Sequence, residues 1–506
     1  MRNLTIFLLL IFPVFAYSQK HDYVWITGDD NQTLDTTYGG SLIDFNFNPV
    51  KATYNYREQN MFTTNSSICD SAGNLLFYTN GCAIAGADDE PLENGDNINP
   101  GSSHTLWCDN YNDGYAGGPQ NSIILPLPDS LGVYLLFHKR FIIYSNPSDV
   151  IFDKQYFSIV DMNQNSGKGE VVAKNVEMMS DTLARGEISA VKHANGKDWW
   201  LVTPRRNSNT FQIFRFTHDG IVDTFHQTIG ILPDPLGEGF GQLVFSPDGS
   251  KLFRTYRYNP VMVYSFDREA GVFTQFDTIH FEYGNQLVGE IGCAVSPSGQ
   301  YLYLSCRKFL YQLDLWAPDI SASQTIVAEW DGFANPFPTM FWQCQLGPDC
   351  KIYVMAGGDT RYYHVIHNPD EPGLACNVEQ RGLPLPTPSG ASMPSFPNYR
   401  LGPLDSPGVP CSPTVSAAPP PTPQHGIRVY PNPATNNVTF DWATTGATTK
   451  RLLLRNSLGQ PLKDIALSSG VEAHTLSVRD VPRGIYFWVL LAADGRQVGA
   501  GKIVKE

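Results

Sequence analysis

A strand–turn–strand hairpin that recurs about every 50 residues constrains this chain more than any other feature. The clearest copies are LVFSPDGSKLFRTY (Leu243–Tyr256) and CAVSPSGQYLYLSC (Cys293–Cys306). The turns of the six copies fall at Gly73, Gly132, Gly196, Gly249, Gly299 and Cys350. Further aromatic and β-branched runs between the copies bring each repeat to about four strands. A repeat of this kind predicts a β-propeller.

The predicted fold class is therefore all-β, with a propeller over residues 21–402. Its length and the hairpin spacing favour about seven blades, and six or eight stay open. Six hairpins are visible. We expect the seventh blade to combine Tyr362–Asn368 and Cys376–Glu379 with the N-terminal strand Tyr23–Thr27, which would close the ring.

The first residues have the pattern of a secretory signal peptide. Arg2 precedes the apolar run Leu4–Phe12, and Ala16 and Ser18 are small residues placed before a cleavage point. We expect residues 1–18 to be removed on export. No later stretch is long and apolar enough to span a bilayer, so no transmembrane segment is predicted.

The C-terminal part of the chain predicts a linker and a second domain. Residues 403–425 are rich in proline and indicate an extended spacer. Residues 426–506 contain about seven short strand candidates and predict a small Ig-like β-sandwich. Pro431 and Pro433 each remove a backbone donor, so that segment is expected at a sheet edge or at the entry to a strand.

Charge limits the partners of the chain. The net charge is −14, while residues 426–506 carry ten Lys and Arg against six Asp and Glu, a balance of +4 that leaves −18 for the remainder. An acidic protein repels phosphate backbones, so a nucleic-acid partner is not expected.

The nine cysteines of an exported chain allow disulfides, although their odd number leaves at least one thiol unpaired. Cys293 and Cys306 end one hairpin copy, and Cys69 and Cys82 end another. Opposed strand ends can approach closely enough for a bond, so these two pairs are the candidate disulfides. The alternative is that each cysteine is a small buried apolar residue.

The sequence offers few candidates for chemistry, and no catalytic residue is predicted. Carboxylates that could collect calcium occur in one loop, although without the regular spacing of a calcium-binding loop: Asp88, Asp89, Glu90, Glu93 and Asp96. No other cofactor is expected, and the identity of any metal is left unknown.

Other charged and aromatic groups are expected to be structural. His364 and His367 face opposite sides of a strand and cannot share a metal. His193 and Asp198 flank a hairpin turn, where a structural hydrogen bond is favoured over catalysis. Two charged stretches, Arg185–Glu187 and Arg205–Arg206, could line the mouth of the propeller, but exposed loop charges are favoured. Trp199 and Trp200 point to opposite faces and predict blade packing.

Two resemblances add to this picture. The turns SPDGSKLF, HANGKDWW and KIYVMAGG, with the closing run to Pro403, resemble secreted β-propellers of the Bacteroidetes with YVTN/WD40-like repeats. The last eighty residues resemble the type A C-terminal sorting domain of the type IX secretion system, with these signature positions: Pro431, Asn432, Pro433, Gly459, Pro482, Gly484, Tyr486 and Lys502. This second resemblance implies the type IX secretion machinery as a partner.

Together these features predict an exported protein at the cell surface or in the medium. A role in binding, adhesion or surface assembly is expected, with an unknown surface glycan or protein as the ligand. The alternative is a hydrolase at the propeller mouth, lactonase-like or glycan-processing, because propellers support both kinds of function.

Overall fold

The computed structural model of the protein describes residues 19–29, 38–143, 150–235, 239, 241–257, 260–280, 291–391, 393–411, 427–442, 449–456, 461–468, 471–492 and 497–506. The chain forms two compact units that divide between Pro413 and Thr414, and each unit is described by itself. Strands dominate both units, which confirms the predicted all-β class. In this described part, no helix has the length and apolar character needed to cross a membrane.

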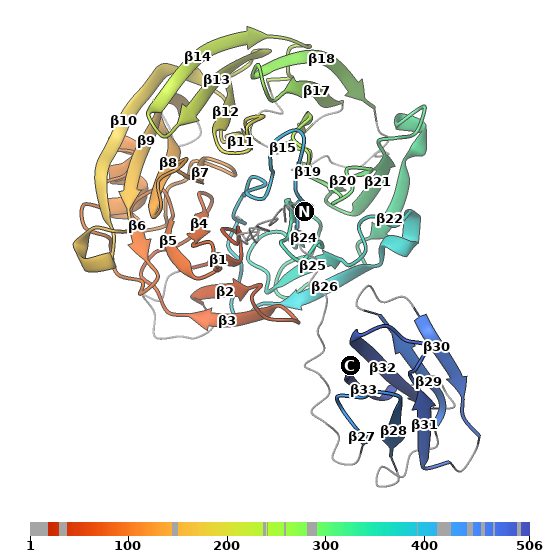
Figure 1. Cartoon of the computed structure of the whole chain (residues 1–506). Coiled ribbons are helices and arrows are strands. Elements are labelled where there is room, and N and C mark those ends of the chain that lie inside the picture. The colour runs from red at the N-terminus through yellow and green to blue at the C-terminus, as the bar shows by residue number, and fades with distance from the viewer. Residues whose placement is uncertain are drawn as a thin grey trace, which may run out of the picture. The chain divides into compact units, whose positions relative to one another are not determined.

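The first unit is a β-propeller of seven small antiparallel sheets arranged around a common centre (Figure 1). The seven sheets confirm the predicted number of blades. We number them as blades 1 to 7 in chain order. Blade 1 contains β1 (Val24–Gly28), β2 (Gly40–Asp44) and β3 (Lys51–Asn55). Blade 2 contains β4 (Ser66–Cys69), β5 (Leu75–Thr79) and β6 (Ile84–Gly86). Blade 3 contains β7 (Ser122–Pro126), β8 (Val133–Ile143), β9 (Val150–Asp161) and β10 (Glu170–Leu183).

The other four blades have four strands each. Blade 4 contains β11 (Ser189–Lys192), β12 (Trp199–Pro204), β13 (Thr210–Thr217) and β14 (Gly220–Thr228). Blade 5 contains β15 (Leu243–Phe245), β16 (Lys251–Arg254), β17 (Val261–Asp267) and β18 (Val272–Ile279). Blade 6 contains β19 (Ile291–Val295), β20 (Tyr301–Cys306), β21 (Phe309–Asp314) and β22 (Thr325–Glu329). Blade 7 contains β23 (Cys344–Leu346), β24 (Ile352–Met355), β25 (Tyr362–Ile366) and β26 (Val378–Pro384).

Helices in the described residues are short and lie in connections. They are α1 (Ser102–His104), the π-helix η1 (Thr105–Asn110), and the 3₁₀ turns η2 (Asn165–Gly167), η3 (Ser321–Ser323) and η4 (Gly373–Cys376). α1 and η1 form one continuous segment in the long connection between blades 2 and 3.

The repeated hairpin of the sequence forms the first two strands of blades 2 to 7. In blade 5 it pairs β15 with β16, so that Leu243 lies opposite Arg254. The turn position has a positive φ in every copy, for example 73° at Gly249 and 66° at Cys350. Glycine adopts this region without a steric penalty, which explains why five of the six copies carry it.

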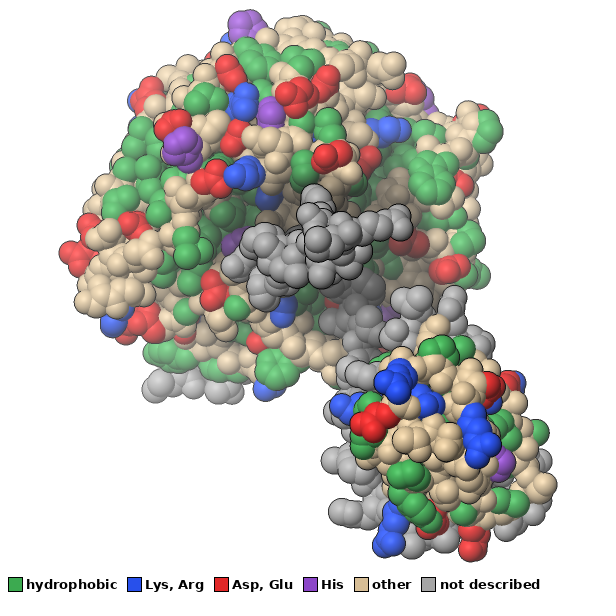
Figure 2. Space-filling view, in the orientation of Figure 1, with side chains coloured by type: hydrophobic (Ala, Val, Ile, Leu, Met, Phe, Trp, Pro, Cys, Tyr) green, Lys and Arg blue, Asp and Glu red, His purple; other side chains and the backbone are tan. Residues whose placement is uncertain are grey.

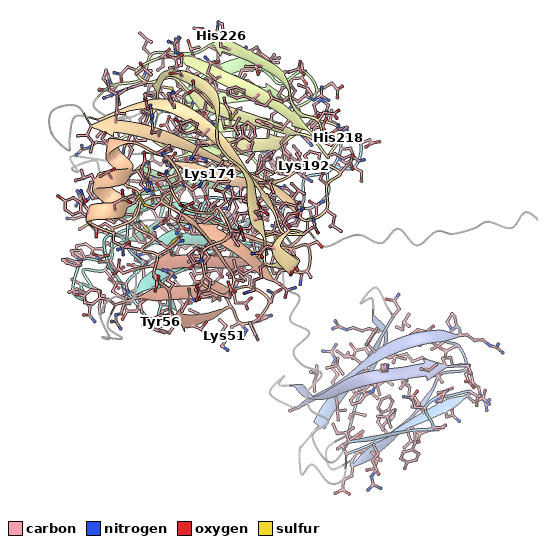
Figure 3. All side chains as sticks on the ribbon, turned by 90° about the vertical axis from the view of Figure 1, so that its left-hand side faces the viewer. Lys51, Tyr56, Lys174, Lys192, His218 and His226 are labelled. Carbon is pink, nitrogen blue, oxygen red and sulfur yellow. A yellow bond between two sulfur atoms is a disulfide. The ribbon has the colours of Figure 1, made fainter. Side chains whose placement is uncertain are left out.

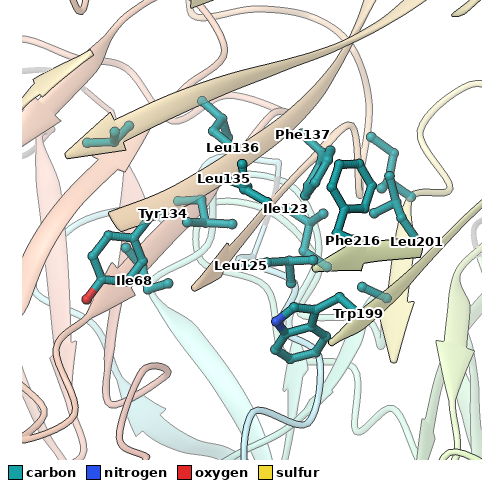
Figure 4. Close-up of a cluster of buried hydrophobic side chains, with 14 of the residues drawn as sticks. Ile68, Ile123, Leu125, Tyr134, Leu135, Leu136, Phe137, Trp199, Leu201 and Phe216 are labelled. Carbon is teal, nitrogen blue, oxygen red and sulfur yellow. The ribbon is translucent and has the colours of Figure 1, made fainter. Parts of the chain in front are cut away.

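Apolar side chains fill the space between neighbouring blades. Figure 4 shows one such cluster, in which Ile68 of blade 2, Leu135 of blade 3 and Leu201 of blade 4 are buried together. Trp199 belongs to this cluster, whereas Trp200 packs in another cluster beside blade 5. The predicted opposite orientation of the two tryptophans is therefore confirmed. Each such side chain contributes about 1.5–3 kcal/mol when it is buried.

The ring does not close in the predicted way. β1 pairs with β2 in a sheet of its own, and blade 7 takes all four of its strands from residues 344–384. The expected sharing of one blade between Tyr23–Thr27 and Tyr362–Asn368 is wrong, because β23 and β24 already occupy the inner positions of blade 7. Blades 1 and 7 instead meet through side chains, with the Trp25 and Tyr353 rings 5.5 Å apart.

The two faces of the propeller differ. We call the face at which β4, β7, β11, β15 and β23 begin the loop face, and the face that carries the hairpin turns the turn face. In Figure 3 the helical segment 102–110 lies on the left, at the loop face, while Lys192 and His218 lie on the right, at the turn face. Figure 2 shows acidic, basic and hydrophobic side chains interspersed over the turn face.

The predicted disulfides do not form. The bonds join Cys82 to Cys108 and Cys350 to Cys411, and Cys69, Cys293 and Cys306 are buried free thiols. Cys69 ends β4 beside the hairpin turn, whereas Cys82 lies beyond the far end of β5.

The register explains the second error. Cys293 lies opposite Leu304 and Cys306 lies opposite Ile291, so the two cysteines are diagonal neighbours. Diagonal neighbours are about 7–8 Å apart, which exceeds the usual span of a disulfide.

The second unit is a β-sandwich. Its three-stranded sheet contains β27 (Arg428–Tyr430), β28 (Asn437–Asp441) and β31 (Ala473–Ser477). Its four-stranded sheet contains β29 (Thr449–Arg455), β30 (Pro461–Ala466), β32 (Gly484–Ala492) and β33 (Gln497–Lys505). The predicted sandwich of seven strands is confirmed, and β27, which precedes Pro431, is an edge strand as expected.

Candidate functional site

The centre of the propeller is occupied by the chain itself. We call residues 385–391 and 393–411 the closing segment. Its backbone at Met393 and Phe396 donates hydrogen bonds to the Gln343 and Gln345 side chains of blade 7. On the other side, the Phe396 ring lies 5.8 Å from the ring of Trp25 in blade 1. The segment therefore lies between the first and last blades, where the ring closes.

The closing segment also binds blades far from this junction. Asn398 Nδ2 donates to the Pro247 carbonyl of blade 5 at 2.7 Å, and the Tyr399 hydroxyl donates to the Ile124 carbonyl of blade 3 at 2.7 Å. Arg400 pairs with the buried Asp22 carboxylate at 2.7 Å. Each net hydrogen bond contributes about 1 kcal/mol, so the segment holds several blades together.

Part of the predicted linker belongs to this closing segment. The Leu404 amide donates to the Ala194 carbonyl of blade 4, and Cys411 is bonded to Cys350 of blade 7. Residues 403–411 therefore pack on the first unit, although their proline content predicts a spacer. Residues 412–426 lie outside the described residues.

The described residues enclose a small cavity near the centre. This cavity of about 70 Å³ is lined by the inner strands of blades 3 to 7 and by the closing segment. Binding sites for small molecules usually measure about 300–1,000 Å³, so this cavity has room for a few water molecules.

A buried ion pair lies close to this centre. Arg254 Nε donates to Glu187 Oε2 at 2.9 Å, and both side chains are at most 1 % exposed. Burial lowers the pKa of Arg254, but the Glu187 carboxylate together with Tyr256 and Tyr264 raises it above its ordinary value. The expectation that Arg185–Glu187 carries only exposed charges is therefore wrong at Glu187.

A larger pocket of about 270 Å³ opens on the loop face between blades 6 and 7. Three connections form it: the β20–β21 turn, the β22–β23 connection and the loop after β24. Its lining residues are Arg307, Phe337, Pro338, Met340, Trp342, Gly357, Gly358 and Asp359. The pocket therefore combines two aromatic rings with one cationic and one anionic side chain. Phe337 is 52 % exposed, which is unusual for a large apolar side chain.

Local geometry holds the pocket open. A Cβ atom at Gly357 would lie 2.4 Å from Trp342 Nε1, so glycine is needed there for the indole to take its place. Arg381 pairs with Asp331 at 2.6 Å and lies 4.5 Å from the Phe333 ring, which fixes the connection that carries Phe337. The hydrogen bond from Arg381 lowers the pKa of Asp331.

The loop carboxylates proposed for calcium have other partners. Asp89 accepts hydrogen bonds from the Tyr78 hydroxyl and the Asn55 amide, and Asp96 pairs with Lys174 at 2.7 Å. Over the residues that the structure describes, no group of three His, Cys, Asp or Glu side chains is arranged to hold a metal ion. Calcium binding remains a prediction from the sequence.

The three histidines singled out in the sequence have partners within the first unit. His364 accepts a hydrogen bond from the Arg381 amide, while His367 contacts Glu379, so the two imidazoles are separated as expected. In the blade 4 hairpin, His193 Nδ1 accepts from the Asn195 amide at 3.1 Å, and Asp198 Oδ2 accepts from Asn195 Nδ2 at 2.9 Å, so both side chains bond within the turn.

In the second unit, signature residues tie loops to strands. Asn432 Nδ2 donates to the Lys502 carbonyl at 3.0 Å, and its Oδ1 accepts from the Val504 amide at 2.8 Å, so this side chain extends the edge of β33. The Tyr486 hydroxyl donates to the Pro482 carbonyl at 2.7 Å. Pro431 and Pro433 flank Asn432, and Gly484 begins β32. Gly459 lies outside the described residues.

Comparison with solved structures yields only distant similarity. A protein of Lactobacillus plantarum shares 12 % identity, covers 74 % of this chain and 99 % of its own, and has a TM-score of 0.43. A functionally unknown protein of Desulfotomaculum acetoxidans shares 12 %, covers 63 % and 85 %, and has a TM-score of 0.34. A luciferin-regenerating enzyme shares 12 %, covers 74 % and 97 %, and has a TM-score of 0.30.

No curated protein sequence matches the chain. Residues 428–506, by contrast, match the family model described as the secretion system C-terminal sorting domain. The match covers both sheets of the sandwich and all the signature positions, which indicates export to the cell surface or the extracellular space. The chain is thus a β-propeller that carries a type IX secretion C-terminal sorting domain at its C-terminal end.

Proposed function

We propose that the protein is an exported ligand-binding module whose propeller holds a saccharide unit in the pocket between blades 6 and 7. The signal peptide predicted over residues 1–18 starts its export, and the sorting domain directs it across the outer membrane. At the cell surface or in the medium, the loop face then presents the pocket. Adhesion or surface assembly is the task that this arrangement serves.

The pocket itself carries the proposal. Its volume of about 270 Å³ is near the lower end of the range for small-molecule sites, which suits a single sugar ring. The Phe337 and Trp342 rings offer apolar surface for the C–H face of a sugar. Arg307 and Asp359 offer a donor and an acceptor for its hydroxyl groups.

Titration of the full-length protein with a panel of mono- and disaccharides tests this proposal. We expect at least one saccharide to bind, and we expect Phe337→Ala to weaken that binding about tenfold, because about 1.4 kcal/mol of ring contact would be lost. Arg307→Ala should also weaken it. Phe47→Ala is the matched control, since Phe47 is 49 % exposed but lies in the β2–β3 turn on the turn face.

Two results would contradict the proposal. One is the absence of binding to every saccharide of the panel. The other is equal affinity for the wild type, the Phe337→Ala variant and the Phe47→Ala control.

A further inference from the structure

A second group of aromatic side chains lies on the loop face, outside the pocket. The Phe62 and Trp107 rings are stacked, with centroids 6.3 Å apart and an interplanar angle of 22°. Tyr111 meets Trp107 edge-on at 5.7 Å and is 58 % exposed. We call Phe62, Trp107 and Tyr111 the aromatic platform.

The platform is built rigidly from two distant parts of the chain. Trp107 lies in the π-helix η1, and Cys108 next to it is bonded to Cys82 in the β5–β6 connection of blade 2. Ser103 in the same helical segment donates to the Phe141 carbonyl of blade 3. π-Helical turns are rare and occur often at functional sites. The disulfide and the hydrogen bond thus fix Trp107 in place before any ligand arrives.

Backbone hydrogen bonds connect the platform to the pocket step by step. The Ala391 amide donates to the Phe62 carbonyl at 3.3 Å, and the Asp359 amide donates to the Gly390 carbonyl at 3.4 Å. Asp359 lines the pocket. Backbone hydrogen bonds of residues 390–391 in the closing segment therefore link the two aromatic groups on the loop face.

Resting on the proposed function, we infer that the ligand is an uncharged polysaccharide chain that extends from the pocket over residues 390–391 to the aromatic platform. Two separate aromatic groups on the loop face suit a polymer, because each group can stack on a different sugar ring.

The charges favour a neutral polymer. Asp109 beside Trp107 and Asp113 beside Tyr111 are both exposed, and the chain up to residue 425 has a net charge of −18. An acidic surface repels an anionic chain, so a polysaccharide without carboxylate or sulfate groups is the complementary ligand.

Affinity electrophoresis of the full-length protein tests the inference. Native gels would contain laminarin, xyloglucan or galactomannan as neutral polymers and alginate as an anionic one. We expect retardation by at least one neutral polymer and about tenfold weaker retardation for Trp107→Ala or Tyr111→Ala. Trp316→Ala is the matched control, since Trp316 is 66 % exposed and lies beside the blade 6 hairpin turn on the turn face.

The outcomes separate this inference from the proposed function. Phe337→Ala could weaken the binding of saccharides while Trp107→Ala and Tyr111→Ala leave the retardation unchanged. In that case the platform does not bind the polymer, but the saccharide site in the pocket is supported. If alginate alone retards the protein, the neutral class is wrong. If no polymer retards it, the inference fails whatever the saccharide titration shows. Circular dichroism of each variant checks that the fold is intact.

Discussion

Cys350 is bonded to Cys411, which joins the one non-glycine turn among the six hairpins to the last described residue of the closing segment. At Cys350 the backbone φ is 66°, a region in which glycine lies in the other five copies. The bond therefore explains why a cysteine stands at a turn position that favours glycine. It also attaches the closing segment at Cys411 to blade 7.

Removal of this bond should destabilise the propeller. We expect Cys411→Ser to lower its stability by about 2–4 kcal/mol, as is usual for the loss of a native disulfide. Cys350→Gly should lose about 1 kcal/mol less, because glycine suits the positive φ. Thermal melting of both variants measures the difference.

The free thiol Cys376 supplies the control for this comparison, since it is buried and bonded to no other cysteine. Cys376→Ser removes a thiol without opening a disulfide, so it should leave residues 403–411 resistant to a protease. Cys411→Ser should expose them to cleavage. Equal cleavage of the two variants would contradict the role assigned to the Cys350–Cys411 bond.

The buried pair of Glu187 and Arg254 predicts that one substitution of similar shape greatly lowers the stability of the propeller. Glu187→Gln keeps the shape of the side chain but leaves the Arg254 charge buried without its carboxylate. Breaking a buried pair in this way costs about 3–5 kcal/mol. Lys197→Ala is the control: it breaks the exposed pair with Asp129, whose side chains are 62 % and 61 % exposed, and such pairs contribute about 0–1 kcal/mol. A similar melting temperature for both variants would refute the prediction.

Sequence patterns predicted the hairpins and blades, because these depend on the spacing of residues close together in the chain. The hairpin copies at Gly249 and Gly299 indicate blades because a turn residue and two short strands are local features. Which strand completes which ring position depends on contacts between the two ends of the chain, so the separate sheet of β1 was missed. The closing segment was missed for the same reason: its prolines predict a spacer, and nothing near them in the sequence signals Asp22 or Cys350.

The candidate site was predicted even less well. The pocket unites Arg307, Phe337 and Asp359 from three connections, each of which is unremarkable by itself. The aromatic platform joins Phe62 to Trp107 across 45 positions of the sequence. By contrast, the signature of the sorting domain is read directly, because residues such as Asn432 and Tyr486 act within a small sandwich of fixed topology.

Buried histidine predicts a loss of stability in acid. His138 is fully buried, with Nδ1 2.7 Å from Asn99 Oδ1 and Nε2 3.0 Å from Ser158 Oγ, and burial lowers its pKa from 6.5 to about 3. The unfolded chain binds this proton near pH 6.5 and the folded chain does not, so stability is fully present above pH 6.5. It should fall by about 1.4 kcal/mol for each pH unit between 6.5 and 3.

Melting temperatures between pH 7.5 and 4.5 measure this effect. His138→Gln should flatten the acid side of the profile, because glutamine does not take up a proton. His218→Gln is the control, since the His218 side chain is 60 % exposed on the turn face. If His138→Gln and His218→Gln give the same profile as the wild type, His138 does not contribute to the pH dependence.

Deletion of residues 427–506 should separate folding from delivery. The propeller forms a compact unit with its own core and its own closing segment, so we expect the truncated chain to fold and to melt like the first unit of the intact protein. Without the sorting domain and its signature residues such as Asn432 and Tyr486, the secretion machinery has no signal to recognise. The truncated protein should therefore accumulate in the periplasm, while the intact protein reaches the surface or the medium.

Cell fractionation with an antibody against the propeller measures the two pools. Detection of the truncated chain at the cell surface in the same proportion as the intact chain would show that another part of the protein directs its export.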